Sequence, residues 1–183
     1  LNRYELPAAD AIILLAAHLG EGKILERMID PSIVDEMDPL SCDPQLDPFA
    51  GANGYRPPPH SSTYSDEFIE RYRTGQRQRV TRLDALALQR LHDRNQARSA
   101  MADPEFGALT PEAQAAALRQ AVVTPYFVVY RTEADLRAFD LAIDPSERDA
   151  GSLFSYRPDL TNYMEFGFGR VTTPRAWLST WLS

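Results

Sequence analysis

The chain has 183 residues, of which 44% are hydrophobic and 25% charged, enough for one globular domain with its own core. The net charge of −7 disfavours binding to the phosphate backbone of nucleic acids. No apolar run approaches the roughly 20 residues of a membrane helix, the N-terminus has no signal-peptide pattern, and the single cysteine, Cys42, excludes an internal disulfide. We therefore expect a cytoplasmic protein that binds neither nucleic acid nor membrane.

The stretch AIILLAAHLGEG, residues 11–22, is the most apolar in the chain. Residues 12–17 have the character of a strand buried on both faces, although alanine and leucine also suit a buried helix. A polar glycine loop follows, and loops at the ends of buried strands often carry active sites. His18 is therefore either a hydrogen-bonded strand-end residue or a site residue, and Glu21 could orient a catalytic histidine. The next residues predict a short helix over about 23–29.

Asp-Pro occurs four times between residues 30 and 60. Each pair favours a turn, because aspartate hydrogen-bonds the local backbone and proline restricts φ. The segment is either an interdomain linker or an ordered excursion. Six apolar residues that could anchor it favour the ordered excursion: Ile33, Val34, Leu40, Leu46, Phe49 and Tyr55.

The clearest helix begins at Asp66, with Ser65 as its N-cap. Its apolar residues recur at helical spacing: Ile69, Tyr72, Val80, Leu83, Leu86 and Leu91. Residues 66–98 also contain eight arginines and five acidic residues. This pattern indicates a solvent-exposed face with ion pairs, or alternatively an anion-binding helix; the acidity of the whole chain favours the exposed face.

The second half of the chain contains two more helix starts, at Pro111 after the N-cap Thr110 and at Pro174 after the N-cap Thr173. Residues 126–132 have the strongest β-propensity. Residues 134–145 fit either a strand or a helix, and the neighbouring strand favours extended structure. The last helix carries an apolar stripe, interpreted as core packing, of Trp177, Leu178, Trp181 and Leu182.

Few residues suggest a catalytic or ligand-binding role. The sequence contains no G-x-S-x-G, phosphate-binding loop, dinucleotide fingerprint or H-E-x-x-H. The three histidines, His18, His60 and His92, lack ligand spacing, so we expect neither a metal nor a cofactor. His60 and His92 are expected at the surface, and Cys42 is interpreted as having no catalytic role.

Four stretches resemble an esterase- or lipase-like bacterial branch of the α/β-hydrolase superfamily: ADAIILLAAHLGEG, DPLSCDPQLDPFAGANGYRPPP, LRAFDLAIDPSERDAGSLFS and GFGRVTTPRAWLSTW. The resemblance covers nearly the whole chain. It implies an α+β fragment: residues 1–30 are a piece of the hydrolase core, with a strand at 11–17 and a short helix. Residues 31–170 are a mostly helical cap with a short β element, and residues 171–183 are a helix that returns to the core.

The same resemblance implies hydrolysis of an ester, amide or related bond in a small molecule by a Ser-His-acid mechanism. The serine would precede Leu1 and the histidine would follow Ser183, so the chain alone is expected to be inert. Glu21 matches the place where some members carry the acid. His18, Tyr163, Phe166 and Phe168 would line the substrate pocket. The alternative is a complete, non-catalytic helical binding or regulatory module.

Overall fold

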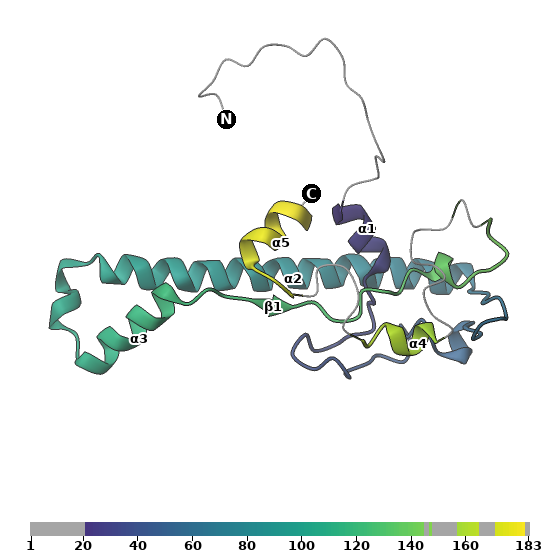
Figure 1. Cartoon of the computed structure of the whole chain (residues 1–183), viewed down its shortest axis with the longest axis horizontal. Helices are drawn as coiled ribbons and strands as arrows, with labels where there is room; N and C mark the ends of the chain where they lie inside the picture. Colours follow the sequence, from purple (N-terminus) through teal and green to yellow (C-terminus); the bar gives the residue numbers. More distant parts are fainter. Residues whose placement is uncertain (1–20, 145–146, 148–156, 165–170, 182–183) are drawn as a thin grey trace, which may run out of the picture.

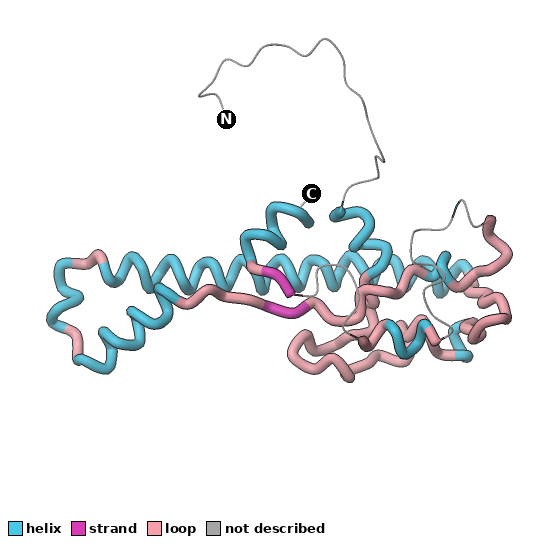
Figure 2. Tube along the Cα trace, in the orientation of Figure 1, coloured by secondary structure: helices cyan, strands magenta, loops and turns pink. Residues whose placement is uncertain are grey.

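The computed structural model describes residues 21–144, 147, 157–164 and 171–181. These residues form helices joined by long loops, with one small sheet (Figure 2). The elements, with η for 3₁₀ helices, are α1 Glu21–Met28, η1 Gly51–Asn53, α2 Asp66–Met101, η2 Pro104–Ala108, α3 Pro111–Val122, β1 Phe127–Val128, η3 Leu136–Ala138, α4 Pro158–Thr161, β2 Val171–Thr172 and α5 Pro174–Trp181. The sheet pairs β1 with β2 antiparallel, with Phe127 opposite Thr172. The described part is thus mostly helical with a small antiparallel sheet, as an α+β class requires.

Helix α2 is the longest element and runs along the long axis of the molecule (Figure 1). Helices α1, α3 and α5 pack against it. Helix α2 begins where the sequence predicts, because the Ser65 hydroxyl accepts a hydrogen bond from the Phe68 amide at 3.2 Å. In Figure 1, α1 and α5 lie on one side of α2, while α4 and most of the loop between α1 and α2 lie on the other. α3 folds back against the C-terminal part of α2.

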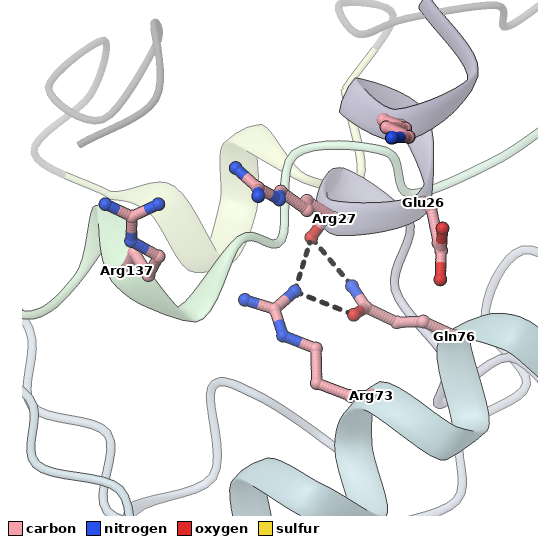
Figure 3. A pocket seen from close by; sticks show the side chains of 6 residues that line it. Glu26, Arg27, Arg73, Gln76 and Arg137 are labelled. Atoms are coloured by element: carbon pink, nitrogen blue, oxygen red, sulfur yellow. Dashed lines mark hydrogen bonds between the residues drawn. The ribbon is translucent and has the colours of Figure 1, made fainter. Parts of the chain in front are cut away.

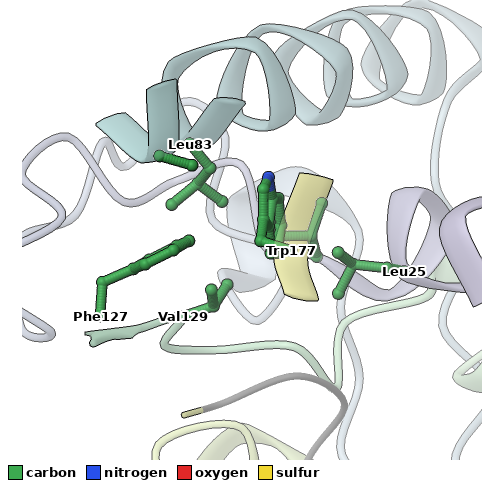
Figure 4. Close-up of a cluster of buried hydrophobic side chains, with 7 residues drawn as sticks. Leu25, Leu83, Phe127, Val129 and Trp177 are labelled. Atoms are coloured by element: carbon green, nitrogen blue, oxygen red, sulfur yellow. The ribbon is translucent and has the colours of Figure 1, made fainter. Parts of the chain in front are cut away.

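The main hydrophobic core joins α1, α2, β1 and α5 (Figure 4). Its centre is Trp177, which is fully buried and donates its indole N–H to Asp84 Oδ1 at 2.7 Å. The surrounding side chains are Leu25, Ile29, Leu83, Ala87, Phe127 and Val129. The predicted packing role of Trp177 is therefore confirmed, and Leu178 packs against the same cluster. The side chain of Trp181, and all of Leu182, lie outside the described residues.

The first part of α2 has a second core, made by Phe68, Tyr72 and Leu136. The Tyr72 hydroxyl donates to the Ala134 carbonyl at 2.6 Å and so connects α2 to the chain before η3. Nearby, the rings of Phe49, Tyr55 and Phe139 form a cluster with centroids 5.2–6.0 Å apart. These contacts hold the loops against the N-terminal half of α2.

The segment rich in Asp-Pro pairs is ordered, as predicted. In every pair the aspartate Oδ1 accepts a hydrogen bond of 2.9 Å from the amide two residues later: Asp30 from Ser32, Asp38 from Leu40, Asp43 from Gln45 and Asp47 from Phe49. Ile33 and Tyr55 are buried anchors. The anchoring roles expected of Val34 and Leu40 are wrong, since these side chains are 64% and 73% exposed.

Two predictions after α3 need correction. Within residues 126–132, only Phe127–Val128 pairs as a strand, because its partner β2 is two residues long. Extended structure over residues 134–145 is wrong, because the Asp135 carboxylate accepts from the Arg137 amide at 3.1 Å and starts η3. The caps Thr110 and Thr173 are confirmed by bonds from the amides of Ala113 and Ala176.

The short helix predicted near residues 23–29 is present as α1, which begins earlier, at Glu21. The strand expected at 11–17 lies outside the described residues. None of the helices in the described part combines the length and apolar character needed to cross a bilayer.

Candidate functional site

A buried polar cluster lies where three distant segments meet. Asp30 follows α1, Arg131 follows β1, and Asn162 follows α4. The three side chains are at most 1% exposed. The backbones of the first two segments are also joined, because the Asp30 amide donates to the Arg131 carbonyl at 2.9 Å. We call these residues, with Ser32 and Cys42, the Arg131 cluster.

The Asp30 carboxylate is fully hydrogen-bonded within this cluster. Its Oδ2 accepts from Arg131 Nε at 2.9 Å, from Arg131 Nη2 at 2.7 Å and from Asn162 Nδ2 at 2.8 Å. Its Oδ1 accepts from the amide and the hydroxyl of Ser32 at 2.9 and 2.7 Å. A buried charge is tolerated only when it is paired and bonded in this way.

The backbone of Arg131 is strained. Its φ of 57° lies in the left-handed region, and no other non-glycine residue in the described ranges has a positive φ. Such a conformation costs on the order of 1–3 kcal/mol and persists only where the surroundings enforce it. Here the enforcing contacts are the Asp30 pair and a bond from Arg131 Nη1 to the Ser41 carbonyl at 3.0 Å.

Tyr163 covers the cluster on its solvent side. Its ring centroid lies 4.5 Å from the Arg131 guanidinium carbon, and its side chain is 41% exposed. Burial raises the pKa of the Tyr163 hydroxyl, while the Arg131 charge opposes that rise. Burial lowers the pKa of Arg131, but Asp30, Tyr163 and Cys42 together raise it by more, so the net direction is upward. Tyr163 is thus an exposed aromatic surface fixed over a buried cation.

Cys42, for which the sequence predicts no catalytic role, belongs to the same cluster. Its Sγ lies 3.5 Å from the Ser32 hydroxyl and 3.9 Å from Arg131 Nη2. The thiol is half-buried and free. Its place is set by Asp43, whose amide donates to the Ser32 carbonyl at 2.7 Å. No local sequence signal could have identified this contact, because Arg131 lies 89 residues away.

The other predicted site residues are mostly not placed. His18, Phe166 and Phe168 lie outside the described residues, and Glu21 is the first residue of α1, with its side chain also outside them. The expected surface positions of His60 and His92 are confirmed. In the described ranges, no group of three histidine, cysteine or acidic residues is arranged to hold a metal ion.

The arginine-rich helix has the predicted exposed arginines at Arg71, Arg77, Arg82 and Arg98, but Arg79 differs. Arg79 is fully buried and forms a two-pronged pair with Glu36, Nε to Oε1 at 2.9 Å and Nη2 to Oε2 at 2.8 Å. Its guanidinium also donates to the carbonyls of Asp30 and Tyr130 at 2.8 Å. The expected kind of ion pair between helical turns occurs at Arg71, 3.9 Å from Glu67.

These bonds explain why the predicted exposure is wrong at Arg79. Arg79 reaches the backbones of both chain segments that carry the Arg131 cluster, so it supports the cluster from α2. Composition and helical spacing do not reveal this role, since Glu36 is 43 residues away in the sequence.

No known protein family, curated protein or solved structure matches the chain.

Proposed function

We propose that this chain forms the cap of an α/β-hydrolase-like enzyme that cleaves an ester, amide or related bond by a Ser-His-acid mechanism. The sequence resemblance suggests this function. The structural observation that supports it best is the contact between α1 and α5, which lie next to each other on the same side of α2 (Figure 1).

A cap is an insertion, and an insertion must leave its host and return to it at neighbouring points. α1 and α5 meet that requirement, because Leu25 of α1 and Trp177 of α5 pack in one core. Segments of the chain between the two helices are also hydrogen-bonded to one another. Asp30, directly after α1, is bonded to Arg131 and to Asn162. The described residues between α1 and α5 therefore form a unit that could be inserted into a host core through the α1–α5 pair.

The cap would shape the substrate pocket and exclude water from the acyl-transfer step. Tyr163 supplies an exposed aromatic surface that a small apolar substrate could contact. Glu21, at the start of α1, remains the candidate for the acid of the triad. The serine and histidine would be contributed by the host core, and no metal or cofactor is part of the proposed mechanism.

The test compares p-nitrophenyl ester hydrolysis by the chain alone and by the product of the same gene with its adjoining coding sequence. We expect the chain alone to be inactive. We expect the longer product to be active and to lose activity on treatment with a serine-directed fluorophosphonate. Hydrolysis by the chain alone that the inhibitor blocks, or an adjoining sequence without G-x-S-x-G, would contradict the proposal.

The role of Glu21 has its own test in the longer product. Glu21→Gln should lower kcat by several orders of magnitude, as expected for loss of a triad acid. Glu67→Gln is the matched control, because Glu67 is an exposed acid at the start of α2. Equal activity of the two variants would remove Glu21 from the mechanism.

A second candidate function is a non-catalytic binding module, which the exposed apolar side chains around α3 favour. Five are 42–70% exposed: Leu109, Leu118, Val122, Val123 and Tyr126. Exposed apolar surface of this kind often marks a protein contact. The same assay separates the two functions, because a binding module gives no inhibitor-sensitive hydrolysis with or without adjoining sequence.

A further inference from the structure

A cavity of about 340 Å³ lies between α1, α2 and η3, apart from the Arg131 cluster. Its lining comes from three segments that are distant in sequence and consists almost entirely of charged side chains: Lys23, Glu26, Arg27, Arg73, Gln76 and Arg137. Its volume falls within the range of small-molecule sites.

The floor of the cavity is held rigidly. Figure 3 shows Arg73 and Gln76 converging on the carbonyl oxygen of Arg27, with donor distances of 3.3 and 2.7 Å. Arg73 Nη1 also donates to Gln76 Oε1 at 2.8 Å, and Gln76 Nε2 donates to the Ile29 carbonyl at 2.8 Å. Gln76 is 1% exposed. These bonds orient the guanidinium of Arg73 before any ligand arrives.

The charge around this floor is positive. Lys23, Arg27, Arg73 and Arg137 carry four positive charges, against the negative charges of Glu26 and of Asp135, the ion-pair partner of Arg73 at 3.0 Å. Cationic side chains therefore outnumber acidic ones in the lining of this cavity, in a chain whose net charge is −7. Neither Lys23 nor Arg137 forms an ion pair with a carboxylate of the described residues.

We propose that this cavity binds a doubly charged oxyanion, a phosphate group or a dicarboxylate. Guanidinium groups present paired N–H donors that match the oxygens of such anions, and a lysine adds a mobile point charge. A dianion would relieve the repulsion among the cationic side chains that line the cavity. The assignment does not depend on the proposed hydrolase function, because binding can be measured on the chain alone.

The experiment measures thermal unfolding of the chain at increasing inorganic phosphate, with sodium chloride at equal ionic strength as the reference. A parallel titration uses malonate. We expect the melting temperature to rise with the logarithm of the concentration of at least one anion, as for a ligand that binds the folded state. The larger shift identifies whether the site prefers phosphate or dicarboxylate.

The Lys23→Gln/Arg137→Gln double variant should bind the preferred anion at least tenfold more weakly by isothermal titration calorimetry. Arg56→Gln/Arg119→Gln is the matched control, because it removes the same charge at two exposed residues that do not line the cavity. The single variant Lys23→Gln should also weaken binding, and its side chain is exposed, so folding is preserved.

Two results would overturn the assignment. The first is that neither anion stabilises the wild-type chain beyond the chloride reference. The second is that the cavity variants and the control lose affinity equally, which would show attraction by overall charge and not by this cavity.

Discussion

Arg131 and Asp30 form a buried ion pair across 101 residues of sequence, with Nη2 and Oδ2 2.7 Å apart. The pair joins the chain leaving α1 to the chain leaving β1. Because both side chains are almost fully buried, removing one of them leaves the other charged and desolvated. The cost of breaking this pair should therefore greatly exceed that of an exposed pair.

Asp30→Ala should lower the free energy of unfolding by about 3–5 kcal/mol, the range for breaking a buried pair. Urea denaturation followed by circular dichroism measures the loss. Glu67→Ala provides the comparison, because its pair with Arg71 is 3.9 Å long and its side chain is 89% exposed. That substitution should cost less than about 1 kcal/mol. Similar losses for the two variants would show that the Asp30 pair is not needed for stability.

At position 131 glycine should be better tolerated than alanine. Both Arg131→Gly and Arg131→Ala remove the ion pair, but only glycine adopts a φ of 57° without steric cost. We expect the alanine variant to be less stable by about 1 kcal/mol. Denaturation midpoints of the two variants, compared with each other, measure this difference. An alanine variant as stable as the glycine variant would mean that the backbone relaxes when the side chain is lost.

Gly75 marks a close approach between α2 and the loop after α1. A Cβ atom at this position would lie 2.9 Å from Pro31 Cβ and 3.2 Å from Leu46 Cδ1. Gly75→Ala should therefore destabilise the protein by about 1–2 kcal/mol, although alanine in a helix normally stabilises. Gly107→Ala is the control, because nothing lies within 4 Å of its added Cβ. A gain in melting temperature for Gly75→Ala would show that the loop moves aside freely.

Asp47 should make stability depend on pH. Burial raises its pKa, and this outweighs the bond from the Phe49 amide at 2.9 Å, which lowers it. The folded state thus holds a proton more tightly than the unfolded state, so Asp47 opposes folding increasingly as the pH rises from its unfolded pKa through its folded pKa.

Asp47→Asn keeps an acceptor for the turn and removes this titration. The stability of the variant relative to wild type should therefore increase as the pH rises from below the unfolded pKa of aspartate, about 3.9, and level off above the raised folded pKa of Asp47. Urea denaturation at several pH values measures it. Asp38→Asn, which changes the same kind of turn acceptor at an exposed aspartate, controls for the turn itself. A relative stability that falls as the pH rises would contradict the assigned direction.

Much of the local structure could be predicted because its causes lie within a few residues. The helix starts at Ser65, Thr110 and Thr173 depend on a hydroxyl and an amide three residues apart. The Asp-Pro turns depend on bonds between residues two apart. Sequence reasoning failed at residues 134–145, where the neighbouring strand favours extended structure but Asp135 caps η3.

The candidate sites were harder to predict because they depend on contacts between distant residues. Arginines spaced along a helix suggest an exposed face. Nothing near Arg79 in the sequence indicates that its side chain is buried and paired with Glu36. The Arg131 cluster and the cation-lined cavity both require the packing of α1 and the β1–η3 segment on α2. Of the pocket-lining residues expected from the family resemblance, Tyr163 alone has a described side chain.

The 36 residues of α2 give the molecule an unusual shape in solution. At 1.5 Å per residue the helix is about 54 Å long. A compact domain of this chain length has a radius of gyration of about 16 Å, which corresponds to a sphere about 41 Å across. Since α2 alone exceeds that diameter, X-ray scattering by this protein should give a maximum dimension of at least about 54 Å, larger than that of a compact sphere of this chain length.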